Sequence, residues 1–582
     1  MSERPVTRIL TRRQTAGRLL EHRPDLSVVR NQRRRARELA ASLGNRSGAV
    51  AVLAAWLAAN PDSDVRDLST ALDNRLQLRL VSVPPKERTP EVTEAALVEE
   101  SFGLGWEQLD EETAAEILLY VSLTGGIPLP QELAAELAGV DAAGVDEVVE
   151  AGFAARDAAH CLTIDGATLT FLESRRELPQ ARLQRRLRLA LGVRDHAGRS
   201  PTGRVELDSL AELACDLLGE LRQPLPMVSL CHRLAERLRR RGDLSGAMRW
   251  VQRGRVAAQA LGDDGLAFVG LLALDEACIV LADQSSVAAR PHVQRAARLL
   301  AAASKAGHPG ADAALLRAQL LRAQIEYATH PSAPEKELRG LSGKLGRERD
   351  IPARAAALQT LGTACFRRGD RSAGRALLHE ARGLLEEVDE GGDSGLTAML
   401  VAEAQGMHPA ADPKTVDQLL ERARVLAGGE MDRPPQSSLP LALHELGLAA
   451  GDKGDREAAA TLLDEAAMLA SSLLPRSHPV TATTAYSRGL LFLSDGEFRR
   501  AEKQLDRALS GWAGAYPKAH PIHAIGRAAR AWAGARAGEI RHEDAARAVD
   551  EATAALGEAK GLDPGWTAQL HALRADLTAV PV

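Results

Sequence analysis

Aromatic residues are scarce in this chain of 582 residues, since Phe, Tyr and Trp together make up only 3% of it. Runs of Val, Ile and Tyr that favour strands are also scarce, so Ala and Leu, which favour helices, must supply the core. Hydrophobic residues nevertheless reach 45%, which leaves ample apolar surface to bury. The sequence predicts a mainly α protein, and its length predicts several domains or an extended repeat array.

Paired cysteines and long apolar runs are lacking too. The five cysteines form no C-x-x-C pair, which favours a reducing compartment over a disulfide framework. The N-terminus has no apolar segment of the signal-peptide type. The longest uncharged apolar run, about Gly48 to Ala59, is too short to span a bilayer. These features predict a cytoplasmic protein without a membrane partner.

Catalytic, metal and cofactor motifs are also missing. The string GDSG at 392–395 imitates the sequence around a protease nucleophile, but it lies in a polar linker between helical segments. His444-Glu445 does not continue into H-E-x-x-H and is interpreted as a pair on a helix face. The net charge of −5 gives no general attraction for nucleic acid. We therefore expect no enzyme activity, no metal and no cofactor, and nucleic acid is an unlikely partner on this count.

Small residues recur in the C-terminal half at a step of about 42. Gly447 and Gly489 are 42 apart, and each is followed at the same distance by a turn dipeptide, Gly454-Asp455 or Gly496-Glu497. Spacings of three and four put the later small residues on one helix face, where they let two helices cross closely. The landmarks of this repeat are Gly362, Gly369, Ala381, Gly447, Gly454, Ala459, Ala466, Gly489, Gly496, Ala501 and Ala508.

This pattern resembles the tetratricopeptide repeat, whose usual unit has about 34 residues. The longer step is similar to the variant of kinesin light chains and many bacterial sensors, and His478-Pro479 and His520-Pro521, also 42 apart, fit that variant. The resemblance implies an α-solenoid of helix pairs over 205–582, with seven or eight repeats. Each pair leaves an apolar face that only its neighbour can bury.

The same resemblance implies a groove for a protein or peptide partner. In the family, the positions three before and one after each marker glycine point into the concave face. Here those positions hold Gln359, Thr363, His444, Leu448, Tyr486, Leu490, Ala528 and Trp532. Tyr486 and Trp532 either anchor a peptide in the groove or pack between repeats, and the sequence leaves both interpretations open.

Two further segments precede the repeats. Residues 1–85 predict a helical segment with helices at Gln32–Leu43 and Gly48–Ala59 and a third beginning near Asp64. Residues 95–178 predict a winged helix of three helices and a hairpin. Its helices are expected at Glu111–Leu123, capped by Asp110, after Pro130, and at about Val145–Ala151, and its strands at His160–Ile164 and Ala167–Phe171 around the turn Asp165-Gly166.

The order of these segments resembles the C-terminal part of STAND-class (NB-ARC-type) regulatory ATPases. In that family an L-G-x-L-P-L-A-L stretch contacts the adenine nucleotide through its Pro; the matching stretch here is 43–50, with Arg46 or Ser47 at the Pro position. The phosphate-binding G-x-x-x-x-G-K-[ST] loop occurs nowhere in the chain. The chain is thus expected to be a truncated relative, a partner of a separate ATPase, or an incomplete reading frame.

Three functions remain open from the sequence. The first is a non-catalytic scaffold or signal-sensing protein that binds a protein or peptide in the solenoid groove, with a separate ATPase or signalling protein as a partner. The second is a remnant of an ATP-dependent STAND regulator. The third is a winged-helix transcriptional regulator, although its candidate reading helix carries Asp146, Glu147 and Glu150 and would repel phosphate.

Overall fold

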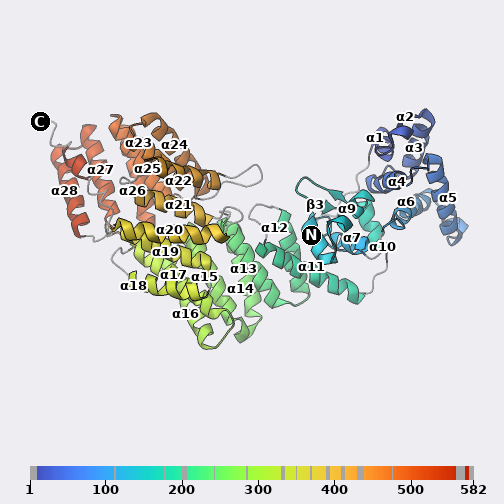
Figure 1. The fold of residues 1–582 in the computed structure, drawn as a ribbon, viewed down its shortest axis with the longest axis horizontal. Helices are drawn as coiled ribbons and strands as arrows, with labels where there is room; N and C mark the ends of the chain where they lie inside the picture. Colours follow the sequence, from blue (N-terminus) through green and yellow to red (C-terminus); the bar gives the residue numbers. More distant parts are fainter. Residues whose placement is uncertain are drawn as a thin grey trace. The chain divides into compact units, whose positions relative to one another are not determined.

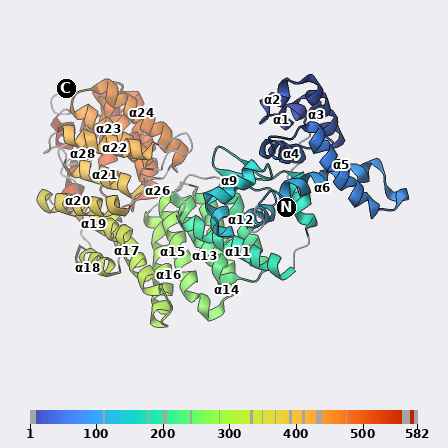
Figure 2. The ribbon, with the colours of Figure 1, turned by 45° about the vertical axis from the view of Figure 1, so that its right-hand side comes forward.

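The computed structural model divides the chain into two compact units, residues 1–200 with 204–230 and residues 201–203 with 231–582 (Figures 1 and 2). The structure describes residues 10–109, 113–175, 179–199, 206–240, 243–283, 286–329, 335–348, 350–367, 370–388, 394–407, 413–428, 438–474, 476, 478–518, 520–558 and 570–575. Helices dominate both units, so the predicted mainly α fold is confirmed.

The first unit holds the helices of the two N-terminal segments and a small sheet. Its elements are α1 Arg12–Leu19, α2 Pro24–Val28, α3 Arg30–Ser42, α4 Ser47–Ala59, α5 Val65–Val81, the 3₁₀ turn η1 Pro85–Glu87, α6 Pro90–Trp106, α7 Thr113–Leu123, β1 Leu129–Pro130, α8 Gln131–Ala138, α9 Ala142–Glu150, β2 Ala155–Arg156, β3 Cys161–Thr163, α10 Gly166–Ser174, α11 Pro179–Arg199 and α12 Glu206–Glu220.

Helices α7, α8 and α9 and a three-stranded antiparallel sheet occupy the segment predicted as a winged helix. The strand order is β1-β3-β2, with Leu129 opposite Leu162 and Arg156 also opposite Leu162 on the other side. The predicted first strand is present as β3, whereas β1 and β2 are too short to show a period in the sequence. Asp110, the predicted cap of α7, lies outside the described residues.

The predicted second strand of the hairpin, Ala167–Phe171, is wrong, because these residues belong to helix α10. Asp165 is the N-cap of that helix, and its carboxylate accepts hydrogen bonds from the backbone N–H groups of Ala167 and Thr168. The dipeptide Asp-Gly fits a tight turn and a helix start equally well. Burial decides for the helix, since α10 packs on α4, α6 and α7.

An aromatic cluster joins α6 to α10 and to the loop after α9, and α6 in turn packs on α4. Phe102, Phe153 and Phe171 lie 5.2 to 6.3 Å apart by their ring centroids, and Trp106 meets Phe153 edge-on. A side-chain carbon on Gly105 would come within 2.2 Å of a methyl group of Val52 in α4. The segments predicted as 1–85 and 95–178 therefore share one core.

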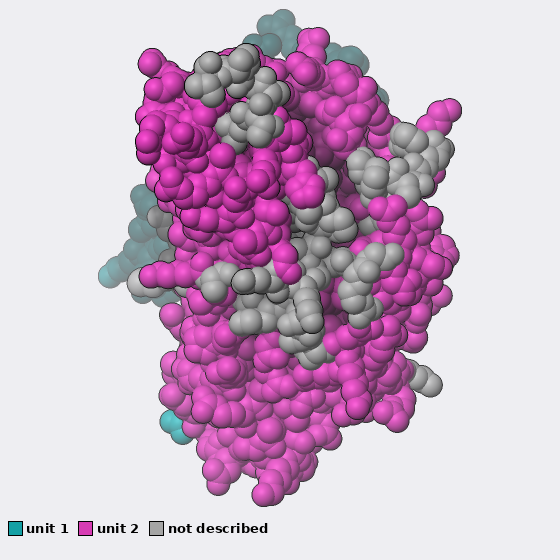
Figure 3. All heavy atoms as spheres, turned by 90° about the vertical axis from the view of Figure 1, so that its left-hand side faces the viewer, with its two compact units in different colours: residues 1–200, 204–230 teal, residues 201–203, 231–582 magenta. Residues whose placement is uncertain are grey.

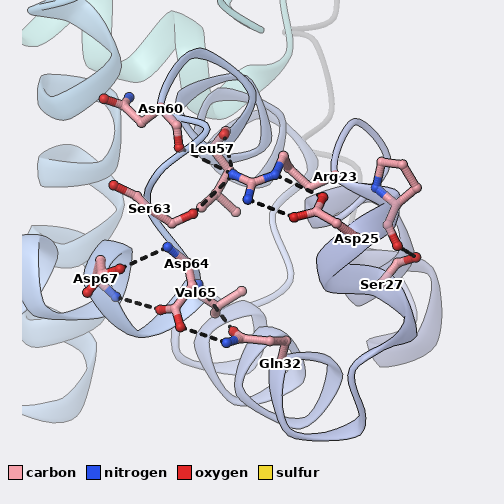
Figure 4. A network of polar contacts seen from close by, with 11 residues as sticks. Arg23, Asp25, Ser27, Gln32, Leu57, Asn60, Ser63, Asp64, Val65 and Asp67 are labelled. Atoms are coloured by element: carbon pink, nitrogen blue, oxygen red, sulfur yellow. Dashed lines mark hydrogen bonds and ion pairs between the residues drawn. The ribbon is translucent and has the colours of Figure 1, made fainter.

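Arg23 holds the beginning of α2 to the end of α4 (Figure 4). Its Nη1 donates to the carbonyl oxygens of Leu57, Asn60 and Ser63 at 3.0 to 3.2 Å, and its Nε and Nη2 bond the Asp25 carboxylate. Carbonyls at a helix C-terminus lack intrahelical donors, so the guanidinium satisfies groups that the helix leaves open.

The second unit is a run of antiparallel helix pairs (Figure 1). The described pairs are α13 Pro224–Arg240 with α14 Leu244–Gln259, α15 Leu266–Asp283 (after the 3₁₀ turn η2 Gly262–Gly265) with α16 Ser286–Lys305, α17 Ala311–Thr329 with α18 Glu335–Arg347, α19 Ile351–Arg367 with α20 Arg371–Val388, α21 Ser394–Met407 with α22 Pro413–Ala427, α23 Leu439–Asp452 with α24 Arg456–Leu473, α25 Pro479–Ser494 with α26 Phe498–Ala515, and α27 Ile522–Arg536 with α28 His542–Glu558. Residues up to Leu230 of α13 belong to the first unit.

Each marker glycine lies where the two helices of a pair cross. A side-chain carbon added to Gly489 would come within 2.9 Å of Leu505, and one added to Gly447 within 2.9 Å of Leu463. Gly362 meets Leu378 in the same way at 2.8 Å. The later small residues, Ala381, Ala459, Ala466, Ala501 and Ala508, are all buried. Gly454 and Gly496 have φ of 81° and 77°, a left-handed conformation that glycine adopts most readily. Gly369 lies outside the described residues.

The crossing predicts opposite effects for two helical Gly→Ala changes. Gly489→Ala should destabilise unit 2 by about 1–3 kcal/mol, because the buried Leu505 must move. Gly343→Ala on the exposed face of α18, where nothing lies within 4 Å, should stabilise the chain by about 0.5–1 kcal/mol. Urea unfolding followed by circular dichroism measures both, and equal effects of the two changes would contradict the close crossing.

Among the described residues, the helical segment Gly262–Ala282 is long and apolar enough to span a membrane. Part of this segment is buried within the unit, and its Asp275 pairs with His232 of α13. A core helix of a solenoid passes the same test, and α15 packs on α14, α16 and α17.

Candidate partner-binding face

The first helices of successive pairs lie closer to one another than the second helices do. From α15 to α25, each first helix contacts the first helix of the next pair, whereas contacts between successive second helices are weaker among the described residues. Closer spacing on one side curves a helical array toward that side. We call the side formed by the first helices, α13 to α27 in odd numbers, the inner face. Figure 3 shows one face of the second unit, with its described residues in magenta.

Four of the residues predicted for the groove are at least partly accessible. Leu448 is 38% exposed, and Gln359, Thr363 and Leu490 are half-buried. Thr363 and Gln359 also serve the helix packing, since Thr363 Oγ1 donates to the Gln359 carbonyl and Gln359 Nε2 donates to the Ala398 carbonyl at 3.2 Å in the next pair. Thr363, Leu448 and Leu490 hold the same position, one residue after the marker, in three repeats.

The two aromatic residues pack inside the solenoid and do not line an open groove. Tyr486 is 2% exposed and its ring lies 5.1 Å from that of Trp512. Trp532 is 7% exposed and meets Phe498 edge-on. Burial also raises the pKa of Tyr486, as expected for a hydroxyl away from solvent. The interpretation of these two side chains as exposed anchors is therefore corrected in favour of packing between repeats.

His444, another predicted groove residue, is buried and joins two neighbouring repeats. Its Nε2 lies 2.9 Å from Ser487 Oγ in α25, and its Nδ1 lies 2.9 Å from Glu445 Oε1. His232 and Asp275 form the equivalent contact between α13 and α15, with Nδ1 and Oδ2 2.7 Å apart. Both pairs are 43 residues apart, so one repeat position reaches across to the next repeat.

A third contact between first helices follows the same plan. Gln324 Nε2 of α17 donates to Thr360 Oγ1 of α19 at 3.1 Å, and Thr360, like Ser487, lies two residues before the marker glycine. We call these three cross-repeat contacts the polar rungs. The polar rungs were not predicted from the sequence. In two of them a histidine is followed 43 residues later by a polar residue, and this recurrence could have identified both.

The first rung pairs two buried titratable groups. Burial opposes ionisation of His232, but the Asp275 carboxylate and Glu236 outweigh it and raise the pKa of His232, while burial raises the pKa of Asp275. Cys278, one turn along α15 from Asp275, has its pKa raised by burial to about 11 and so remains a thiol. A buried histidine–carboxylate contact fixes which repeats are neighbours, because a shifted stacking would leave these buried polar groups without partners.

The second rung has the connectivity of a serine–histidine–carboxylate catalytic triad, but its surroundings do not suit nucleophilic catalysis. Ser487 and His444 are only 8% and 3% exposed. Ser487 also lies within α25, where backbone N–H groups are used by the helix and cannot form an oxyanion hole. The repetition of the arrangement as His232 with Asp275 instead assigns it to repeat packing. In the GDSG string, Gly392 and Asp393 lie outside the described residues.

The recurring His-Pro pairs have a local role at helix starts. His478 is the N-cap of α25, and its Nδ1 accepts the N–H of Val480 at 3.2 Å, while Pro479 occupies the first helical position. His520 Nδ1 accepts the N–H of Ile522 at 3.3 Å in the same way. Burial lowers the pKa of His478 to about 4, so the ring stays neutral and keeps its acceptor.

This cap predicts a pH dependence. Because the folded pKa of His478 is lowered, its contribution is complete above the ordinary value near 6.5 and is lost as the pH falls toward 4. Between pH 7 and pH 4.5, wild type should lose on the order of 2 kcal/mol more than His478→Asn, which retains a cap acceptor without titrating. Thermal melts at both pH values measure the difference, and identical losses would contradict the capping role.

In the first unit, polar side chains that could contact a nucleotide or DNA already bond other residues of the unit. At the stretch matching the ATPase linker, Ser47 Oγ donates to Asp165 at 3.0 Å and Arg46 pairs with Glu94. Helix α9 starts at the cap Asp141 and bears Asp146, which pairs with Arg156 of β2. Among the described residues no group of three or more His, Cys, Asp or Glu is placed to hold a metal ion.

No family model and no curated protein matches the chain. Similar solved structures include a signal transduction ATPase with numerous domains and a tetratricopeptide-repeat sensor from Pyrococcus horikoshii (11% identity, 98% of this chain and 72% of the other, TM-score 0.32). The apo quorum sensor NprR from B. thuringiensis (13%, 66% and 97%, 0.40) and tetratricopeptide-like repeats of a putative kinesin light chain from P. anserina (17%, 36% and 97%, 0.27) are also similar. With TM-scores of 0.40 and below, these likenesses assign neither a family nor a function to the chain.

Proposed function

We propose that the second unit is a non-catalytic binding solenoid that holds a protein or peptide segment on its inner face. The observation that carries this proposal is the row formed by Thr363, Leu448 and Leu490, one residue after the marker in three first helices. The row offers apolar and hydroxyl surface on three first helices, α19, α23 and α25, and the polar groups of the neighbouring rungs already have partners. An extended peptide or a partner helix can use such repeated contacts.

The proposal is tested by selecting peptides from a displayed random library on the full-length protein and mapping the bound peptide by hydrogen exchange. We expect protection in α19, α23 and α25, whose side chains form the row. Protection confined to second helices such as α24 and α26, or to the first unit, would contradict the inner face as the binding surface.

The finer form of the proposal is a cytoplasmic signal-sensing role together with a separate ATPase. It is supported by the order of the segments in the sequence and by the absence of a phosphate-binding loop from the chain. The five cysteines form no disulfide within the described residues, and four of them are buried, which suits a reducing compartment. Titration of the full chain with ATP tests this form, since tight binding by this chain alone would favour an ATP-dependent regulator.

A further inference from the structure

A basic pocket lies at the helix ends of the last two helix pairs of the second unit. It has a volume of about 430 Å³ and is lined by Gly496–Arg500, at the turn between α25 and α26, and by Arg536 and Ala537 at the end of α27. Three of its seven lining residues are arginines. We propose that this pocket binds an oxyanion, the phosphate or carboxylate group of a ligand.

Arg536 is held in place by aromatic rings without its charge being neutralised. Its guanidinium carbon lies 5.4 Å from the ring centroid of Phe498 and 5.7 Å from that of Trp532. No carboxylate partner of Arg536 is present in the part of the chain that the structure describes. Stacking on aromatic faces pre-orders a guanidinium and leaves its N–H donors available for a bidentate oxyanion.

The other two arginines have incomplete partners. Arg499 is 85% exposed, and its one acidic neighbour, Glu539, is 3.9 Å away. Arg500 bonds Glu497 at 2.6 Å, and its guanidinium also lies over the ring of Phe492. The three arginines thus face two carboxylates, which leaves the described pocket with an excess of one positive charge.

Backbone groups add to this charge. The pocket contains the N-terminus of α26, a helix of 18 residues whose cap residue Glu497 makes no side-chain hydrogen bond to the first turn. First-turn N–H groups carry a partial positive charge and point out of the helix, the arrangement that receives phosphate and carboxylate oxygens in proteins. Arginine donors and a helix start therefore converge in one depression.

A third feature lies against the pocket wall. Trp532 is 7% exposed, yet its Nε1 has no hydrogen-bond partner among the described residues. An indole N–H buried without an acceptor is costly, and an anion or a water held beside it would satisfy it. The ring packs against Phe498 and Arg536, and both of these residues line the pocket.

The test is calorimetric titration of the full-length protein at low ionic strength with two probes, inorganic pyrophosphate and citrate. We expect saturable binding of pyrophosphate, citrate or both, and the probe that binds identifies the source as phosphate or carboxylate. Arg536→Gln and, separately, Arg499→Gln should each weaken binding about tenfold or more, because a charged hydrogen bond is lost. Raising the salt concentration should weaken it further.

Arg547→Gln on α28 is the matched control, since Arg547 is 66% exposed and does not line the pocket. It should bind like wild type. Because Arg499 is largely exposed, Arg499→Gln keeps the test valid even if loss of Arg536 disturbs the fold. The proposal would be overturned if neither pyrophosphate nor citrate bound saturably, or if Arg499→Gln bound the probe as tightly as wild type. Neither outcome bears on peptide binding by the inner face.

Discussion

Trp512→Ala is expected to destabilise the C-terminal repeats by about 3–5 kcal/mol. Trp512 is fully buried in α26, where its ring lies 5.1 Å from Tyr486 of α25 and its Nε1 donates to Thr483 at 3.4 Å. A side-chain carbon on Gly526 of α27 would come within 2.9 Å of the same ring. One side chain therefore joins three consecutive helices, and its loss leaves a cavity at the junction of two repeats.

Native-state hydrogen exchange is the suitable measurement, because a solenoid unfolds in parts and a single midpoint would average over repeats. Exchange should accelerate in α25 to α27 and change little in α15 and α16. Met468→Ala provides the control, since Met468 of α24 is 64% exposed and should cost less than about 0.5 kcal/mol. A loss below 1 kcal/mol for Trp512→Ala would show that the ring is not the junction described here.

Arg23→Ala is expected to cost about 2–4 kcal/mol within the first unit. The Arg23 side chain is only 12% exposed, and its removal leaves the carbonyls of Leu57, Asn60 and Ser63 without their donor. The bond to Asp25 is a lesser part of the effect, because that carboxylate is 58% exposed. The loss should appear as faster exchange in α2, in α4 and at the beginning of α5.

Arg23→Lys separates geometry from charge. Lysine keeps the positive charge but lacks the planar fork that reaches three carbonyls and a carboxylate together, so it should recover less than half of the loss. Asp25→Asn should cost far less than Arg23→Ala, because solvent screens this exposed carboxylate. If Arg23→Lys were as stable as wild type, the positive charge alone, and not the set of hydrogen bonds from the guanidinium, would stabilise this junction.

The helix pairs were predictable because a small residue is required wherever two helices cross. Gly447 and Gly489 indicate the crossing in the sequence, because Leu463 and Leu505 leave no room for a side chain at these two positions. Helices α3, α4 and α8 were likewise predictable from apolar runs and from Pro130. Helix α10 was not predictable, and a strand was predicted in its place. Asp165-Gly166 fits a hairpin turn and a helix cap equally well, and only the packing of α10 on α4, α6 and α7 decides between them.

Side-chain roles on the inner face were harder to predict than the helices. An aromatic residue three positions before a marker fits a groove or a core, and Tyr486 is buried because Trp512 of the second helix reaches it. The polar rungs depend on contacts between different repeats, such as His444 with Ser487, that no single repeat reveals. The basic pocket joins two turns about 40 residues apart, 496–500 and 536–537, and likewise has no local motif.

The central claim, that the inner face binds the partner, is tested most directly by a pair of substitutions. Leu448→Asp changes a 38% exposed side chain on first helix α23, and Met468→Asp changes a 64% exposed side chain on second helix α24. For a peptide selected on the wild-type protein, titration should show at least about tenfold weaker binding to Leu448→Asp, because an apolar contact is lost and a charge is desolvated. Binding to Met468→Asp should be unchanged, and the reverse order of affinities would contradict the account.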